Sequence, residues 1–202
     1  MKRAFDLTGA MIGLILTSPI LLVAAIAVKL GSPGPAFYSG PRVGRGGTVF
    51  EIHKLRSMKI GAADSGPSVT AAGDPRVTPA GRFLRRTKID ELPQLWNVVK
   101  GEMSLVGPRP EHPDFVARFT ERERRLLSVR PGMTGPAALE FHDEERRLRV
   151  ADPVDTYVHE VLPRKLEIEL GYLDSAGFVS DLVILARTLW LVLRRLFVRA
   201  DS

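Results

Sequence analysis

The chain has 202 residues, no cysteine and a formal net charge of +6 at pH 7. This length suits one domain of ordinary size. The lack of cysteine excludes disulfides, thiolate metal sites and a cysteine nucleophile. The positive charge favours anionic partners, namely nucleic acid, phosphorylated substrates or an acidic lipid surface, and composition alone does not choose among them.

The first predicted element is an uncharged apolar run at residues 7–28. As a helix with a rise of about 1.5 Å per residue, it would be long enough to cross a bilayer. Pro19 lies in the middle of the run, lacks a backbone N–H and clashes with the carbonyl of Ile15, so we predict a kink or break there. The hydroxyls of Thr17 and Ser18 are expected to satisfy the freed backbone groups.

Basic residues flank this run on both sides, whereas a spanning helix usually has its excess of lysine and arginine on one side only. They are Lys2 and Arg3 before the run, and Lys29, Arg42, Arg45, Lys54 and Arg56 after it. The sequence therefore predicts a re-entrant helix–break–helix over residues 1–30, which dips into one leaflet. Two alternatives remain open: a kinked helix that crosses the bilayer once, and a cleaved signal peptide with its small residues at 25–27.

Two strand-like segments follow a loop rich in glycine and proline at residues 31–35. Residues 36–38 and 48–54 are joined through the glycine-rich segment 42–47, which predicts a small β-hairpin. These glycines are not followed by the Gly-Lys-Ser/Thr of a phosphate-binding loop, so a turn is the favoured interpretation. Residues 61–81 are rich in small and polar residues and are expected to form a loop.

An amphipathic helix is predicted at residues 178–197, near the C-terminus. Its apolar face comprises Leu182, Leu185, Ala186, Leu189, Trp190, Leu193 and Phe197. Arginines lie off this face, which suits a helix in the membrane interface, and packing on the protein's own core is an equally open alternative. The pattern as a whole predicts an α+β fold that is mostly helical with a small β-hairpin, an N-terminal re-entrant membrane helix and a C-terminal amphipathic interfacial helix.

The most informative stretch is TKIDELPQLWNVVKGEMSLVGPRP, at residues 87–110. It contains the adjacent acids Asp90 and Glu91 and closes with Arg109 between two prolines. A basic cluster precedes the acids and consists of Arg82, Arg85, Arg86 and Lys88. Carboxylates that attack phosphorus or hold a metal, beside bases that hold phosphate, suggest phosphoryl-transfer chemistry. An acid pair by itself is also ordinary at the start of a helix, so the pair alone does not decide.

We predict a helix in this stretch, from Thr87 to Gly101. Thr87 is the expected N-cap, Pro93 suits the first turn, and Gly101 suits the C-terminal end. The expected apolar face consists of Leu92, Leu95, Trp96 and Val99. Neighbouring residues of a helix point about 100° apart, so Asp90 and Glu91 are expected to have different tasks.

The stretch resembles the signature of the bacterial sugar transferases, and the resemblance extends through KLRSM at 54–58 and VRPGMTG at 129–135 over nearly the whole chain. It implies a monotopic phosphoglycosyl transferase. Residues 1–30 would form the re-entrant helix, and residues 31–202 a cytoplasmic catalytic domain with interfacial helices.

The implied reaction has two steps. Asp90 attacks the β-phosphorus of a UDP-sugar and expels UMP, and a polyprenyl (undecaprenyl) phosphate then attacks the phosphosugar-aspartate. The product, a polyprenyl diphosphosugar, would begin the assembly of an exopolysaccharide, an O-antigen or a glycoprotein.

The same resemblance makes Asp90 and Glu91 the catalytic residues, with Glu91 holding Mg²⁺ as a hard oxygen ligand. The residues expected to bind substrate phosphate are Arg85, Arg109, Lys54, Arg130 and Asp155. A plain structural role for Arg130 is an open alternative, and the sequence around Asp155 departs from the family pattern. Arg56 is a further candidate to line the site.

Other charged and titratable residues carry no predicted chemistry. The acid run at residues 143–145 is expected to face solvent. The four histidines lack the spacing of metal ligands, and none is assigned to a metal.

The implied partners are a UDP-sugar, a polyprenyl phosphate and the bacterial inner membrane, with the active site on its cytoplasmic face and no role for nucleic acid. A homodimer is left open, and the sugar is not determined. A non-catalytic basic module that binds acidic lipid would explain the apolar run and the charge, but not the acids followed by Pro-Arg-Pro. A nucleic-acid-binding protein would not explain the apolar N-terminal run.

Overall fold

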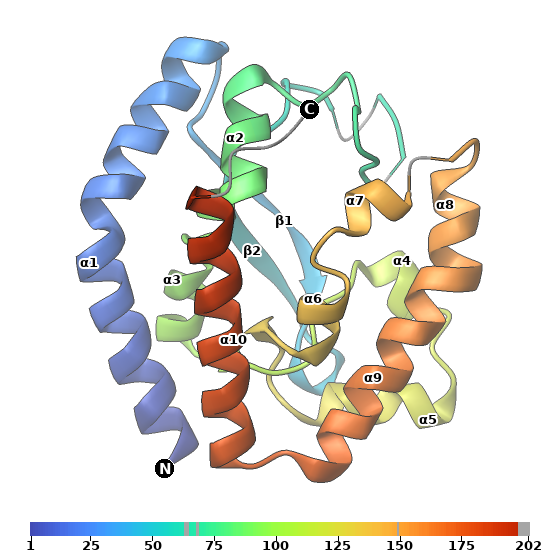
Figure 1. Ribbon diagram of the computed structural model, residues 1–202. Helices are drawn as coiled ribbons and strands as arrows, with labels where there is room; N and C mark the ends of the chain where they lie inside the picture. The colour runs from blue at the N-terminus through green and yellow to red at the C-terminus, as the bar shows by residue number, and fades with distance from the viewer. Residues whose placement is uncertain (63–64, 68, 149, 198–202) are drawn as a thin grey trace.

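The computed structural model describes residues 1–62, 65–67, 69–148 and 150–197 (Figure 1). Its α-helices are α1 (Lys2–Gly31), α2 (Pro79–Thr87), α3 (Gln94–Lys100), α4 (Pro113–Val116), α5 (Glu121–Arg124), α6 (Pro136–Glu140), α7 (Glu144–Arg147), α8 (Pro153–Thr156), α9 (Leu162–Ser175) and α10 (Phe178–Phe197). Shorter helical turns are η1 (Arg45–Gly47), η2 (Ile89–Glu91), η3 (Arg125–Ser128) and η4 (Tyr157–Val161). The strands are β1 (Phe37–Val43), β2 (Val49–Leu55), β3 (Ser104–Val106) and β4 (Gly132–Thr134). The prediction of a mostly helical α+β fold is confirmed.

The predicted hairpin is present as the antiparallel pair β1 and β2. Phe37 lies opposite Leu55 at one end of the pair, and Val43 lies opposite Val49 at the other. The turn between them is η1, where Gly46 and Gly47 have φ angles of 71° and 79°, a conformation that glycine adopts without strain. A second, parallel pair of β3 and β4 was not predicted, because each strand has only three residues.

The helix α1 runs unbroken from Lys2 to Gly31 with Pro19 inside it, so the predicted break is not found. The expected compensation is confirmed and explains why the helix continues. Ser18 Oγ donates to the carbonyl of Ile15 at 2.8 Å, and this is the carbonyl that Pro19 leaves without a donor. Thr17 Oγ1 donates to the carbonyl of Gly13 at 2.7 Å. The hydroxyl of Ser18 therefore satisfies the carbonyl that Pro19 frees, while the hydroxyl of Thr17 bonds within the preceding turn.

Both halves of α1 pack on the same body. Ala10, in the first half, is fully buried in a cluster with Ile52 of β2 and Val98 of α3. Ala24 and Val28, in the second half, belong to a cluster with Leu55 and Leu84. The opposite face of α1 is exposed and apolar, with Met11, Ile12, Ile15, Leu16, Ile20, Leu22, Val23, Ile26 and Leu30.

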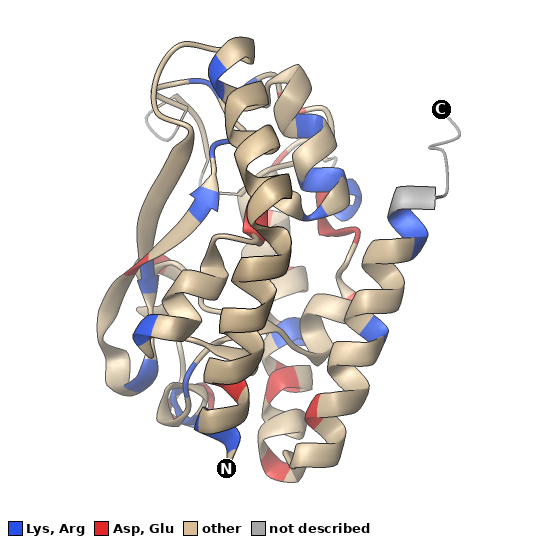
Figure 2. Ribbon diagram, turned by 90° about the vertical axis from the view of Figure 1, so that its left-hand side faces the viewer, with Lys and Arg blue, Asp and Glu red and all other residues tan. Residues whose placement is uncertain are grey.

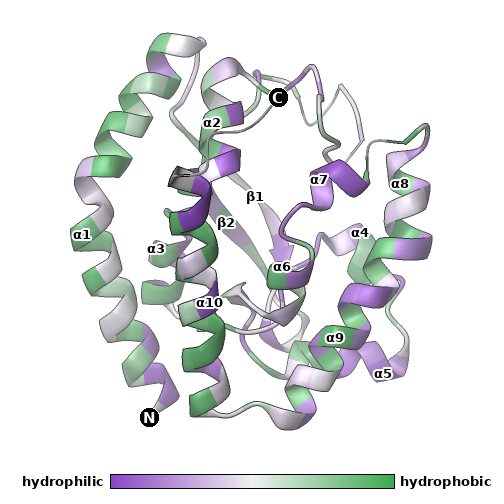
Figure 3. Cartoon of the chain, in the orientation of Figure 1, coloured by the Kyte–Doolittle hydropathy of each residue, from purple (hydrophilic) through white to green (hydrophobic). Residues whose placement is uncertain are grey.

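By length and composition, α1 is apolar enough to cross a membrane, with a mean hydropathy of 2.5 over its most apolar window. Figure 2 shows its middle free of charged residues, and Figure 3 shows α1 and the neighbouring α10 as the most hydrophobic long helices.

Polar contacts tie both ends of α1 to the rest of the chain. At the start, Arg3 donates to the carbonyls of Val98 and Val99 at 2.7 and 3.0 Å, and the buried Asp6 accepts from Ser104 Oγ at 2.9 Å. After the end of α1, Arg56 donates to the carbonyls of Ser32 and Pro33. Arg56 is buried and bonds the backbone after α1, and its place in the site stays a prediction.

The helix α10 packs through one face and exposes another. Asp181 and Ile184 are buried, and Thr188 Oγ1 shares a hydrogen bond of 2.7 Å with Thr134 of β4. Of the predicted apolar face, Leu182, Leu189, Trp190 and Leu193 are exposed, Ala186 is also exposed and Leu185 is half-buried. The side chain of Phe197 lies outside the described residues. The core thus takes only part of the helix and leaves a large apolar surface uncovered.

Candidate active site

The two acids lie between two short helices rather than at the start of one. Thr87 is the last residue of α2, and its hydroxyl donates to the carbonyls of Phe83 and Leu84 at 2.9 and 3.1 Å. Lys88 then adopts a left-handed conformation with φ of 60°, which ends α2. The prediction of Thr87 as an N-cap is therefore wrong, because its hydroxyl bonds backwards along the chain. Asp90 and Glu91 lie in the following 3₁₀ turn, η2.

Backbone packing fixes the start of α2. The N-cap is Thr78, whose Oγ1 accepts from the backbone N–H of Gly81 at 2.9 Å. Gly81 lies against the backbone of Ser57, and a Cβ at this position would be 1.9 Å from the Ser57 carbonyl oxygen. Only glycine fits there, so α2 is held directly on the segment that follows β2 and carries the acids toward Lys54.

The helix α3 ends as predicted but buries a different set of residues. Gly101 has φ of 89° and closes the helix. Leu95 is buried as expected, but Trp96 is 52% exposed. Asn97 is fully buried instead; its Nδ2 donates to the carbonyl of Glu51 at 2.7 Å, and its Oδ1 accepts from the backbone N–H of His53 at 3.0 Å. A polar side chain therefore joins α3 to β2 beside the acid pair.

Asp90 is a buried carboxylate with an unsatisfied oxygen. The residue is 5% exposed, and within the described part of the chain its Oδ1 has no hydrogen-bond partner. Burial raises the pKa of Asp90 and the neighbouring Glu91 raises it further, whereas Lys54, Lys88 and Arg85 oppose this. A buried oxygen without a partner is costly to the fold and is a common feature of functional sites.

Glu91 is the centre of a cluster of cations. Its Oε1 lies 2.7 Å from Arg109 Nη2, 3.2 Å from Lys54 Nζ and 3.9 Å from Lys88 Nζ. Burial by itself would raise the pKa of Glu91, but these three cations, with Arg109 first, hold it well below its usual range. Glu91 in turn raises the pKa of Arg109. The two adjacent acids therefore have opposite shifts, and such divergence marks carboxylates with different tasks.

Arg85 lies on α2 beside the acids and forms an ion pair with another carboxylate of the chain. Its guanidinium contacts Glu145 Oε1 at 2.7 Å. Glu144 lies 3.0 Å from Lys165 Nζ through its Oε2. The expectation that residues 143–145 face solvent holds in part, because Glu144 and Glu145 are partly exposed yet both contact basic residues on other elements.

The remaining two predicted phosphate-binding residues contact groups outside the acid pair. Arg130 Nε donates to the carbonyl of Gly101 at 2.8 Å, which caps the end of α3. Asp155 is exposed on α8 and pairs with His159 at 2.9 Å. The structure therefore brings together Lys54, Asp90, Glu91 and Arg109, places Arg85 within electrostatic reach, and gives Arg130 and Asp155 other partners.

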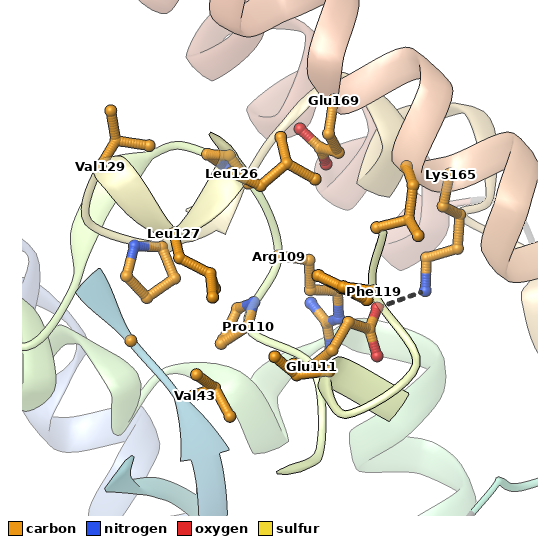
Figure 4. A pocket seen from close by; sticks show the side chains of 15 residues that line it. Val43, Arg109, Pro110, Glu111, Phe119, Leu126, Leu127, Val129, Lys165 and Glu169 are labelled. Carbon is orange, nitrogen blue, oxygen red and sulfur yellow. Dashed lines mark hydrogen bonds and ion pairs between the residues drawn. The ribbon is translucent and has the colours of Figure 1, made fainter. Parts of the chain in front are cut away.

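A small cavity of about 30 Å³ lies behind Arg109, and buried charges surround it (Figure 4). Lys165 Nζ contacts Glu111 Oε1 at 3.2 Å, and Tyr157 Oη donates to Glu111 Oε2 at 2.9 Å. Glu169 of α9 points into the cavity, and burial raises its pKa to about 8. These residues were not predicted. Lys165 and Glu169 lie one helical turn apart amid apolar residues, and such a pair is a signal that the sequence did offer.

Residues 1–195 match the sequence pattern described as bacterial sugar transferase. The chain belongs to this family. It is 42% identical over 193 residues to a UDP-glucose:undecaprenyl-phosphate glucose-1-phosphate transferase of Caulobacter vibrioides, covering 93% of this chain and 67% of that protein. It is 38% identical over 196 residues to a UDP-N-acetylgalactosamine-undecaprenyl-phosphate N-acetylgalactosaminephosphotransferase of Aeromonas hydrophila, covering 95% of this chain and 43% of that protein.

A third relative, the uncharacterized sugar transferase EpsL of Bacillus subtilis, is 36% identical over 195 residues, with 96% of this chain and 87% of that protein covered. The chain thus spans between about two fifths and most of the length of these relatives. The named sugars differ between relatives, so membership of the family does not choose the sugar.

The residues of this sugar transferase fit an Mg²⁺ site whose ligands come partly from the protein and partly from the substrate phosphates. Within the described residues there is no group of three or more metal-ligating side chains. Mg²⁺ in phosphoryl-transfer sites is commonly held by one or two carboxylates together with substrate phosphates and water. Glu91 and the unpartnered Oδ1 of Asp90 offer such a donor set, provided that Glu91 exchanges part of its pairing with Arg109 and Lys54 for the cation.

Proposed function

We propose that this sugar transferase moves a sugar-1-phosphate from a UDP-sugar to a polyprenyl phosphate through a covalent intermediate on Asp90. The observation that carries the proposal is the difference in surroundings between the adjacent acids at residues 90 and 91. Asp90 is buried with an unpartnered oxygen, and Glu91 gathers Arg109, Lys54 and Lys88 beside it. The names of the relatives in Caulobacter vibrioides and Aeromonas hydrophila support the class of acceptor.

In the first step, a carboxylate oxygen of Asp90 forms a bond to the β-phosphorus of the donor. The bond from that phosphorus to the bridging oxygen breaks, and UMP leaves with the electron pair. In the second step, a phosphate oxygen of the lipid attacks the same phosphorus, and the bond to Asp90 breaks. The carboxylate is regenerated, so no external base is needed to make the nucleophile.

The cations beside Asp90 reduce the electrostatic repulsion that opposes this reaction. An ionised Asp90 and a diphosphate repel each other, and the low exposure of the site strengthens that repulsion. Arg109 can hold phosphate oxygens through both arms of its guanidinium, while Lys54 contributes a compact charge. Bound by Glu91, Mg²⁺ would neutralise charge that develops on the departing phosphate.

We also propose that α1 enters the cytoplasmic leaflet of the bacterial inner membrane without crossing it. Ala10 and Val28 lie in opposite halves of α1 yet pack on the same body. Arg3 and Asp6 tie the start of the helix to α3 and β3. Moving the start of α1 to the far side of a bilayer would unpair the half-buried Arg3 and the buried Asp6. The exposed apolar faces of α1 and α10 would meet lipid, and the lipid phosphate would lie near the site.

The test is a screen for UMP release over a panel of UDP-sugars with Mg²⁺ and polyprenyl phosphate. At least one donor should release UMP, and mass spectrometry after donor treatment without lipid should find a phosphosugar on Asp90. Absence of UMP with every donor would contradict the function. UMP release without a trapped adduct, even on rapid quenching, would contradict the covalent route.

The membrane placement has its own test. Single cysteines placed before Lys2 and after Ser32 should react with a membrane-impermeant reagent only when the cytoplasmic face is open to it. Labelling of the N-terminal cysteine from the opposite face would contradict the placement of α1 in one leaflet.

A further inference from the structure

One face of the β-hairpin extends the cationic cluster away from Asp90. Side chains directly opposite each other in an antiparallel pair lie on the same face. Tyr38 lies opposite Lys54, and Arg42 lies opposite Phe50 four positions further along the strand, so both pairs are on the same side of the sheet. Tyr38, Arg42 and Lys54 therefore share one face, and Lys54 already reaches Glu91.

Arg42 is a half-buried guanidinium without a carboxylate partner among the described residues. Its Nη1 donates a hydrogen bond to the carbonyl of Pro41 at 2.7 Å. Burial lowers the pKa of Arg42, Glu111 opposes this, and Arg109 lowers the pKa further, so two guanidinium groups lie within electrostatic reach of each other.

Glu111 does not need Arg42, since it is already paired. Its two carboxylate oxygens contact Lys165 and Tyr157 at 3.2 and 2.9 Å. A second arginine beside Arg109, with donors to spare and no acid of its own, suits an anion that the protein itself does not supply.

Tyr38 offers a flat apolar surface on the same face. Its side chain lies along the strand over Gly40, because a Cβ at Gly40 would be 2.4 Å from the Tyr38 hydroxyl oxygen and 2.9 Å from Cζ. The residue is nevertheless 42% exposed. A ring that lies on the sheet with an open side is suited to stacking on a planar base.

We propose that this hairpin face binds the nucleoside monophosphate part of the sugar donor, with Arg42 on its phosphate and Tyr38 on its nucleoside. This inference rests on the proposed function and adds the site from which the leaving nucleotide departs. Lys54 and Arg109 are left to hold the phosphate that Asp90 attacks. The acceptor lipid makes no use of Arg42 or Tyr38.

The first test compares Arg42→Gln with Arg45→Gln. Arg45 is exposed in the turn of the same hairpin and serves as the matched control. For Arg42→Gln, the KM for the UDP-sugar and the inhibition constant of added UMP should both rise by about tenfold or more, since a charge-assisted pair is lost. The KM for polyprenyl phosphate should stay within about twofold, and Arg45→Gln should change none of the three constants.

The second test compares Tyr38→Ala with Phe37→Ala. Phe37 is an adjacent exposed aromatic residue on the opposite face of β1. Loss of stacking should raise the inhibition constant of UMP by about fivefold or more in Tyr38→Ala, while Phe37→Ala leaves it unchanged. Gly40→Ala should act like Tyr38→Ala, because the added methyl group displaces the ring.

Two results would overturn the inference while leaving the proposed function intact. One is UMP release by the wild-type enzyme with unchanged donor constants in Arg42→Gln and Tyr38→Ala. The other is a rise confined to the KM for polyprenyl phosphate, which would assign the face to the lipid. If Arg42→Gln does not fold, Arg42→Lys tests the same point, and an unchanged UMP constant in that variant would also overturn it. Absence of UMP release in the wild-type enzyme would instead overturn the proposed function.

Discussion

A run of three acids, at residues 143–145, and the pair at residues 90 and 91 both face basic residues, and they differ in how their carboxylates are paired. In the run, Asp143 lies 3.5 Å from Arg147, Glu144 pairs with Lys165, and Glu145 pairs with Arg85. At the pair, Glu91 alone takes three cations, while Asp90 keeps a buried oxygen without a partner among the described residues. Adjacent acids are thus not enough to make a site. The candidate site is the pair in which one carboxylate is desolvated and left unsatisfied.

The acids of α7 and Asp90 also differ in what they contribute to the stability of the fold. The acids of α7 are partly exposed, at 30% and 43% of their side-chain surface, and ion pairs at such positions contribute little. Asp90 costs stability because it is buried and its Oδ1 has no donor within the described part of the chain. A fold tolerates such a cost where function needs the group, and this makes the comparison testable by mutation.

The largest effect is expected for Asp90→Asn. Without a carboxylate nucleophile, UMP release should fall by at least about 10⁴-fold, and the phosphosugar adduct should disappear. The pKa of Asp90 is raised in the folded protein, so its ionised form destabilises the fold at neutral pH. Asp90→Asn should therefore raise the free energy of unfolding by about 1–2 kcal/mol, as measured by urea denaturation. A variant that loses both activity and stability would point to a structural role.

Glu91→Gln should come next, with a loss of about 10²–10³-fold in turnover. The neutral amide can no longer hold Arg109 and Lys54 together, and it is a poor ligand for Mg²⁺. The concentration of Mg²⁺ that gives half-maximal UMP release should rise in parallel. An unchanged Mg²⁺ dependence would exclude Glu91 as the metal ligand.

Arg109→Lys should lower kcat/KM for the donor by about 10–100-fold, although the charge is conserved. The ammonium group cannot bind two phosphate oxygens as a planar fork does. Steady-state kinetics on the purified enzyme measure this effect. Full activity in this variant would show that Arg109 provides charge only.

The pH dependence should separate the two acids at residues 90 and 91. Because the pKa of Asp90 is raised, the nucleophilic form appears at higher pH than for an ordinary aspartate with a pKa of about 3.9. Below the raised pKa of Asp90, the rate of adduct formation should fall by about tenfold per pH unit. Glu91 has a lowered pKa and stays ionised throughout this range. Rapid-quench measurements of the first step report this limb, and a limb at the usual aspartate value would contradict the role of burial.

The smallest effect is expected for Glu145→Gln. Arg85 would lose its carboxylate partner and become available to phosphate, so the KM of one phosphate substrate should fall by up to about threefold. Glu160 is an exposed acid on η4, and Glu160→Gln provides the control. A large loss of activity in Glu145→Gln would place the acids of α7 in the catalytic machinery. It would contradict the distinction between these acids and the pair at residues 90 and 91.

Much of the local structure followed from short-range rules. Pro19 with Ser18 predicted where backbone groups are freed and how they are satisfied, and Gly101 predicted the end of α3. The hairpin followed from its strand-like segments and glycine-rich turn. The same rules misplaced Thr87, since a hydroxyl can bond forward or backward along the chain and its neighbours in sequence do not decide which.

The candidate site was predicted in part. Asp90, Glu91 and Arg109 lie within one recognisable stretch, and Lys54 came from the family resemblance. Arg130 and Asp155 came from the same resemblance, yet they contact Gly101 and His159. Residue type and spacing state which groups are present, but they do not state which partners compete for them.

The amino-acid sequence by itself determined the apolar N-terminal run, the hairpin, the acid pair and the family of this protein. These depend on periodicity, on turn residues and on a long ungapped motif, all of which are local in the chain. Only the tertiary structure decided that both halves of α1 dock on one body and that Trp96 is exposed while Asn97 is buried. It also decided that, among the described residues, one oxygen of Asp90 lacks a partner where Glu91 has three cations. Burial and pairing are set by contacts between segments far apart in sequence, and those contacts exist only in the folded chain.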